Sequence, residues 1–195
     1  MEDHRSPAAT PPVFRRFVRV GIAAALALGA HLASAAELGT YVGVTGQGLP
    51  VSLTVVQSPT GRGTEISSIQ FSYALNCATP ESQVSLGITM TGAFRIGLVG
   101  GFQQAIELAD EFYTQFDGRF DASGNVGGRT SEAMSVLTQA VPHVSELCSI
   151  GPLLWRAHRQ AGNAPTTAAP QVDYIVDIRL DREGQVIDQS IRSAR

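Results

Sequence analysis

Short runs in which apolar and polar residues alternate dominate the chain from Leu38 to about His158. In the clearest run Val51, Leu53 and Val55 alternate with Ser52 and Thr54. A period of two places alternate side chains on opposite faces of an extended strand, so this pattern predicts a half-buried β-strand. Four further runs share it: Ile66 to Ala74, Val84 to Thr89, Phe94 to Leu98 and Phe112 to Phe116. Turn-forming residues separate the runs, and we therefore predict a mainly all-β fold, an antiparallel β-sandwich or barrel.

Two segments are less clear from the sequence. Phe102 to Glu111 is rich in helix formers, so it is either one short helix or a loop insert between two strands. The predicted fold therefore contains at most one short helix. Ser131 to Leu137 follows a glycine-rich stretch, and its position favours a strand.

The chain changes character after Arg159. Residues 160–170 are almost entirely Ala, Pro, Thr, Gly and Asn, a linker composition. Residues 171–195 contain two alternating runs around Asp181 to Gly184, the pattern of a C-terminal β-hairpin. We predict a β-sandwich domain over 36–159 that folds without this tail. The apolar face of the hairpin still needs cover, so the hairpin either adds to an edge of the sandwich or binds an envelope or extracellular protein partner.

Residues 1–35 have the order of a secretory signal peptide. Arg15, Arg16 and Arg19 precede an apolar stretch that ends near Leu32, and the small residues 33–36 follow. We predict cleavage after Ala35 or Ala36. The apolar stretch is shorter than the about 20 residues of a transmembrane helix, although an uncleaved anchor is the alternative. No second such run follows, so we expect an exported protein, periplasmic or extracellular, without a stable membrane span after cleavage.

Composition excludes several classes of function. All fourteen basic residues are arginine, and without lysine the chain cannot perform Schiff-base chemistry, bind phosphate with a Walker-A loop or supply the kinase β3 lysine. Removing the first 35 residues leaves 160, with ten arginines and 15 acidic residues, a net charge near −5. Nucleic-acid affinity comes mainly from arrays of basic side chains, so we expect no nucleic-acid partner.

The two cysteines, Cys77 and Cys148, permit one pairing in an oxidising compartment. A bridge across about 70 residues would stabilise the fold by roughly 4 kcal/mol through the entropy of the unfolded chain. The alternative is two free buried thiols. A metal site is a poorer interpretation, because neither cysteine has a close ligand partner. Trp155 follows Cys148 by seven residues, and we interpret it as structural core packed against the disulfide.

A glycine-aromatic opening strand (Gly39 to Thr45), the two cysteines and a late tryptophan in Trp155-Arg156-Ala157 form a recognisable combination. Over about residues 39 to 159 the chain resembles a group of small exported bacterial β-rich proteins of unknown function. The resemblance implies a fold and an exported location, and no activity. The stretch 100–110 and the tail after Gly162 depart from it.

One segment could bind calcium. Asp121, Ser123, Asn125, Gly127 and Glu132 occupy ligand positions of a twelve-residue calcium loop. However, Val126 stands where the loop needs glycine, and the flanking runs are strands. We therefore favour a hairpin turn at 121–125 and predict no metal site and no cofactor.

Candidate catalytic groups are few. His143 and His158 are the imidazole bases of the exported chain, no G-x-S-x-G motif occurs, and the acidic pairs Glu107 with Glu111 and Asp117 with Asp121 are explained equally well as solvated charge. We therefore assign no catalytic residue. The favoured function is a non-catalytic module that binds a protein or surface ligand at the cell envelope or outside the cell. The alternative is a small secreted hydrolase that uses carboxylates.

Overall fold

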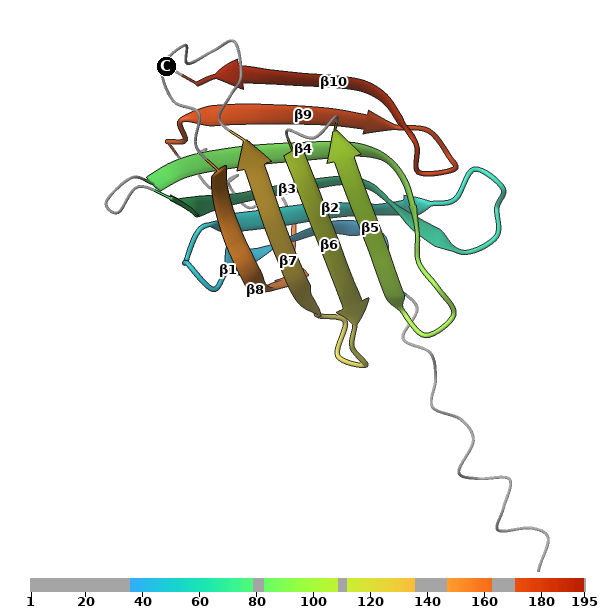
Figure 1. Cartoon of the computed structure of the whole chain (residues 1–195). Helices are drawn as coiled ribbons and strands as arrows, with labels where there is room; N and C mark the ends of the chain where they lie inside the picture. The colour runs from blue at the N-terminus through green and yellow to red at the C-terminus, as the bar shows by residue number, and fades with distance from the viewer. Residues whose placement is uncertain (1–35, 79–82, 109–111, 136–146, 163–170, 195) are drawn as a thin grey trace, which may run out of the picture. The chain divides into compact units, whose positions relative to one another are not determined.

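The structure is a computed structural model that describes residues 36–78, 83–108, 112–135, 147–162 and 171–194. The predicted signal peptide and most of the predicted linker lie outside these residues. The described residues form no helix, and the all-β prediction is confirmed. The ten strands, shown in Figure 1, are β1 Gly39–Thr45, β2 Pro50–Gln57, β3 Thr64–Cys77, β4 Gln83–Arg95, β5 Gly101–Leu108, β6 Phe112–Phe120, β7 Val126–Ser135, β8 Leu147–Arg159, β9 Tyr174–Leu180 and β10 Val186–Ser193.

All ten strands belong to one sheet with the order β10-β9-β4-β3-β2-β1-β8-β7-β6-β5. Neighbouring strands are antiparallel except for β4 and β9, which are parallel. In Figure 1 the first six strands of this order run across the view, and β5 to β8 cross in front of them. The sheet thus folds over on itself, and the core lies between its two parts.

Two contacts give the fold its barrel-like closure. The end of β3 pairs with the start of β8, where Cys77 faces Cys148. On the other side, the Gln104 side chain on β5 donates a hydrogen bond to the carbonyl of Gly184 in the β9–β10 turn, at 3.2 Å. These contacts join parts of the chain that are neighbours neither in sequence nor in the main strand order.

Aromatic rings fill the space between the two parts of the sheet. Phe71 of β3 stacks on Phe116 of β6 with ring centroids 5.0 Å apart, and Phe116 stacks on Trp155 of β8 at 4.7 Å. Phe102 of β5 lies next to both Phe116 and Trp155. These four rings are buried because inward positions on each strand recur every second residue.

The structure corrects the interpretation of Phe102 to Glu111. Residues 101–108 are strand β5, neither a helix nor a loop, and residues 109–111 lie outside the described residues. Phe102, Ile106 and Leu108 are buried, while Gln103 and Glu107 face outward. Pairing with β6 along the whole strand outweighs the helix propensity of these residues.

Phe94 to Leu98 is not a separate strand either. Strand β4 continues through Thr91 and Gly92, between the two runs expected to be separate strands, and forms a bulge there opposite β3. Gly92 has φ of 155°, and a Cβ there would lie 2.9 Å from Leu180. Residues 96–100 form the turn into β5.

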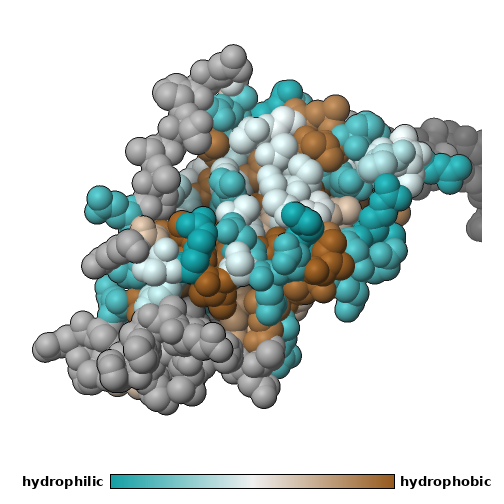
Figure 2. Space-filling model, turned by 90° about the horizontal axis from the view of Figure 1, so that it is seen from above, coloured by the Kyte–Doolittle hydropathy of each residue, from teal (hydrophilic) through white to brown (hydrophobic). Residues whose placement is uncertain are grey.

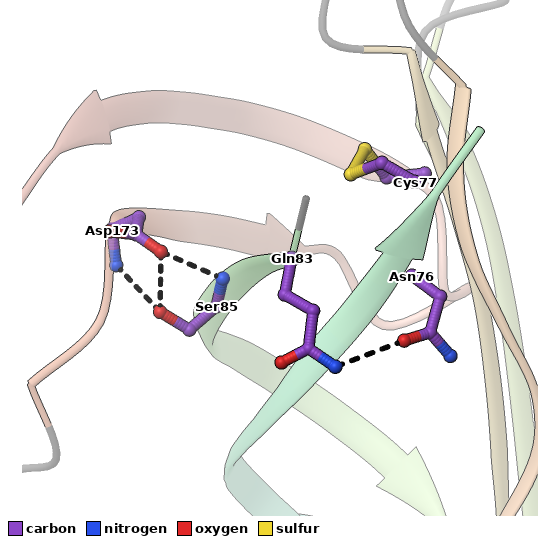
Figure 3. The surroundings of a disulfide bond; sticks show 6 residues. Asn76, Cys77, Gln83, Ser85 and Asp173 are labelled. Carbon is purple, nitrogen blue, oxygen red and sulfur yellow. Dashed lines mark hydrogen bonds between the residues drawn. A yellow bond between two sulfur atoms is a disulfide. The ribbon is translucent and has the colours of Figure 1, made fainter. Parts of the chain in front are cut away.

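The predicted C-terminal hairpin is present as β9 and β10. Strand β9 pairs with β4, and its side chains Val176, Ile178 and Leu180 are buried in the core. Asp173 fastens the start of β9: its carboxylate accepts hydrogen bonds from the amide and hydroxyl of Ser85 at 3.0 and 2.7 Å (Figure 3). The hairpin therefore adds to an edge of the sheet, one of the two arrangements expected.

No helix within the described ranges is long and apolar enough to cross a membrane.

Candidate functional site

The most unusual polar group of the core is the carboxyl of Glu132 on β7, which is 2% exposed. Thr114 lies directly opposite it on β6, and Thr130 lies two residues earlier on β7. Both threonine hydroxyls donate hydrogen bonds to Oε1 of Glu132, that of Thr130 at 2.8 Å. Because the inward positions of paired strands adjoin one another, the sheet itself assembles this cluster.

Burial controls the protonation of this group. It raises the pKa of Glu132 to about 8, because a charged carboxylate is poorly solvated in the core, and interactions with Thr114, Thr130 and Tyr73 offset only part of the effect. Glu132 is thus mainly a neutral acid at pH 7. Burial and the neighbouring Glu132 also raise the pKa of the Tyr73 hydroxyl well above its usual value.

The second carboxyl oxygen of Glu132, Oε2, has no hydrogen-bond partner among the described residues. Within the described part of the chain, Oε2 of Glu132 and the hydroxyl of Tyr73 are buried without a partner in hydrogen-bonding geometry. Both threonine hydroxyls donate to Oε1, so the proton of the neutral acid is best placed on Oε2. A neutral acid costs far less to bury there than a carboxylate would.

Sequence reasoning did not find this cluster as a unit. From the sequence, Glu132 is a candidate only for the last ligand position of the calcium loop, although it shares even spacing on β7 with the buried Val126 and Thr130. That spacing places Glu132 inward. Its partners Thr114 and Tyr73 come from β6 and β3. The pattern of residues within β7 cannot predict which side chains of other strands lie beside Glu132.

The predicted turn at 121–125 joins β6 to β7. Oδ1 of Asp121 accepts hydrogen bonds from the amides of Ser123 and Asn125 at 2.8 and 3.0 Å, and Gly124 has φ of 78°. These bonds use the Asp121 carboxylate to close the turn, while Glu132 points into the core. The structure therefore does not bring the two acids of the considered calcium loop together. No group of three or more His, Cys, Asp or Glu residues in the described ranges could hold a metal ion.

The other candidate catalytic groups do not converge. His158 is exposed on β8, and Glu107 is exposed on β5. Asp117 on β6 lies 3.9 Å from Arg129 on the outer face of the sheet. His143 and Glu111 lie outside the described residues. The enclosed acid Glu132 can hold a proton, but its side chain offers no surface to a substrate in this conformation, so the hydrolase alternative gains no support from it.

The three residues expected to be structural are Cys77, Cys148 and Trp155, and they lie in the core or pack against it. Cys77 and Cys148 are joined by a disulfide (Figure 3). Trp155 is 4% exposed and packs against Phe116 and Phe102, and its indole nitrogen donates a hydrogen bond to the carbonyl of Asp117 at 3.1 Å. The rings of β5 and β6 thus provide its packing partners.

An open pocket lies where β5 begins and β6 ends. Its volume is about 550 Å³, and its lining includes Arg95, Val99, Gly101, Arg119 and Gly127. A second open pocket of about 400 Å³ shares Arg95 with it and reaches the β9–β10 turn. Guanidinium groups at an open surface suit binding of anionic groups better than acid-base catalysis.

Comparison of the chain with family models, with curated proteins and with solved structures finds no match.

Proposed function

We propose that the protein is an exported, non-catalytic β module that binds an extended segment of an envelope or extracellular protein along strand β10. The observation that carries this proposal is the position of β10. It ends the strand order of the sheet, and no strand within the described residues pairs with its outer edge. An exposed edge offers backbone donors and acceptors to an added strand.

The rest of the hairpin holds this edge in place. Strand β9 contributes three buried side chains to the core, and Asp173 ties its start to Ser85. β10 pairs with β9 from Val186 to Ser193. A partner strand would therefore bind to an edge that is already ordered, which lowers the entropic cost of association.

Side chains of β10 face solvent along most of its length. Ile187, at the register shift near the start of β10, is 59% exposed, whereas Asp188 to Ser190 are polar and exposed. Figure 2 views the molecule from above, the side on which β10 lies in Figure 1; pale and hydrophilic residues dominate the middle of this face, with separate apolar areas around them. Such a surface favours recognition through the backbone, with few apolar anchors.

The exported location rests on the first 35 residues. The disulfide is compatible with an oxidising compartment. Intact-mass measurement of the protein from its own cells should place the mature N-terminus at Ala36 or Glu37. A full-length mass in the membrane fraction would support an uncleaved anchor instead.

Site-specific photo-crosslinking tests the binding edge. A photoreactive residue at Ser190 on β10 should give a crosslinked partner in the native envelope, and the same residue at Thr60, exposed in the β2–β3 turn, should not. Addition of Ile187→Asp should weaken the crosslink from position 190. Equal crosslinking from both positions, or none from position 190, would count against strand addition at β10.

A further inference from the structure

The turn between β4 and β5 exposes two apolar side chains at its tip. Leu98 is 94% exposed and Val99 is 62% exposed. The turn is closed by backbone hydrogen bonds from Gly97 to Gly101 and from Gly100 to Gly97, each 2.8 Å long. Leu98 and Val99, which we call the apolar tip, are therefore held outward by a short, well-bonded turn.

Arginines surround the apolar tip. The guanidinium of Arg119 donates a hydrogen bond to the carbonyl of Val99 at 3.1 Å, and Arg95 lies at the end of β4, just before the turn. Arg95, Val99 and Arg119 line the same open pocket. The tip and these two exposed cations thus form one surface.

The register of β6, β7 and β8 extends this positive charge. Arg119 on β6 pairs with Gly127 on β7, and Gly127 pairs with Arg156 on β8, so two arginines lie on either side of a residue without a side chain. In the next row Arg129 lies beside Asp117. We call the outward surface formed by Arg119, Arg129 and Arg156 the basic face.

This charge is unusual for the chain. The exported chain has a net charge near −5, yet the basic face presents three arginines against Asp117 in its two rows. Within the described residues, no ion pair forms at Arg95, Arg119 or Arg156. Free cations on one face of an acidic protein direct that face toward an anionic partner.

We propose that the apolar tip and the basic face dock together on an anionic lipid surface. Leu98 and Val99 would enter the boundary between headgroups and acyl chains, while Arg95, Arg119 and Arg156 would contact lipid phosphates. An acidic protein is the less suitable partner, because the exposed apolar residues of this surface are aliphatic: Leu98 and Val99 at the tip, and Leu154, which is 65% exposed beside Arg129. None of these is an aromatic anchor of the kind typical of protein interfaces. Docking is peripheral and reversible, since the anchor is small.

Vesicle binding tests this surface with the chain that begins at Ala36, which contains every described strand, the disulfide and the core. We expect sedimentation with vesicles of phosphatidylcholine and phosphatidylglycerol, weaker sedimentation at high salt, and little with phosphatidylcholine alone. Leu98→Ser should weaken binding by about tenfold, because it removes one inserted apolar side chain. The double variant Arg119→Gln, Arg156→Gln should weaken it by more than about tenfold, since each arginine near an anionic surface contributes about fivefold.

Matched variants separate this surface from general effects. Ile187→Ser removes an exposed apolar side chain on β10, and Arg62→Gln with Arg179→Gln removes two exposed arginines elsewhere. These controls should leave vesicle binding within about twofold of the parent chain. Absence of binding to anionic vesicles, equal loss in the controls, or binding to soluble acidic polypeptide without binding to vesicles would overturn the proposal. Ile187 lies on β10, the proposed edge for a partner strand. Its use as a control therefore separates vesicle binding at the apolar tip and basic face from partner binding at β10.

Discussion

At the scale of single residues, Glu132 makes stability depend on pH. Its pKa is about 8 in the folded protein, whereas an exposed glutamate titrates near 4.5. Between these values the folded state keeps a proton that the unfolded chain has released. The free energy of unfolding therefore falls as pH rises through this window, by at most about 1.4 kcal/mol per pH unit, and levels off above it.

Glu132→Gln should remove this dependence. The amide has the shape of the neutral acid, its oxygen can accept the two threonine hydrogen bonds, and its NH₂ group takes the place of Oε2, which is buried without a hydrogen-bond partner among the described residues. Relative to the parent chain, the variant should gain stability steadily between about pH 5 and pH 8. Urea unfolding at several pH values measures the gain. Glu107→Gln, which makes the same substitution at an exposed position on β5, should show no such trend, and a gain for Glu132→Gln that is independent of pH would contradict the assigned protonation.

Gly118 leaves room for two aromatic rings of the core because it has no side chain. A Cβ atom at this position would lie 2.5 Å from the Phe102 ring and 2.7 Å from the Trp155 ring. Gly118→Ala should therefore cost about 1 to 3 kcal/mol of unfolding free energy through overpacking. Trp155 fluorescence during urea unfolding reports it. Gly151→Ala on β8, where a Cβ would meet nothing within 4 Å, is the control, and equal losses in both variants would show that strand flexibility, not ring packing, decides the cost.

At the scale of elements, period two predicted the strands whose inward residues are mostly apolar. The structure places Val51, Leu53 and Val55 inside, as their pattern predicts. β5 was missed because Gln104 occupies an inward position between Phe102 and Ile106, which leaves apolar residues four apart, as on a helix. Gln104 lies there because it bonds to the Gly184 carbonyl of a distant turn, which local sequence does not reveal.

The C-terminal hairpin is now expected to be necessary for stability, although the sequence suggested that the core would fold without it. Truncation after Arg159 would expose the edge of β4 that pairs with β9 and would remove Val176, Ile178 and Leu180 from the core. Burial of such side chains contributes about 1.5 to 3 kcal/mol each, so the melting temperature should fall steeply. Calorimetry of the truncated and full chains measures the loss.

A milder variant keeps that prediction testable if the truncated chain does not fold. Asp173→Ala removes the bonds to Ser85 and should lower stability by about 1 to 3 kcal/mol. Asp188→Ala, at an exposed position on β10, should change it little. An unchanged melting temperature in both the truncated chain and Asp173→Ala would show that the hairpin is dispensable for the stability of the core.

At the scale of the whole molecule, the fold class and the disulfide could be predicted from the sequence, whereas the strand order could not. Alternation is a local property, and the two cysteines allow one pairing. The parallel placement of β9 beside β4 joins residues almost ninety positions apart, as the Ser85 and Asp173 bond shows. The basic face likewise arises only when β6, β7 and β8 are in register, because Arg119, Arg129 and Arg156 form no cluster in the sequence.

The disulfide acts on the same scale, because it closes the sheet where β3 meets β8. Cys77 and Cys148 are 71 residues apart in sequence, and β4 to β7 lie between them. The bridge restricts the unfolded chain, so Cys77→Ala with Cys148→Ala should lower the free energy of unfolding by about 4 kcal/mol. Urea unfolding of the oxidised chain, the double variant and the parent chain in reductant measures this, and the reduced parent separates loss of the bond from loss of the side chains.

Alkylation of the unfolded protein without reductant should label neither cysteine. Full labelling of both, or equal stability of the oxidised and reduced chains, would show that the closure depends on strand pairing and core packing alone.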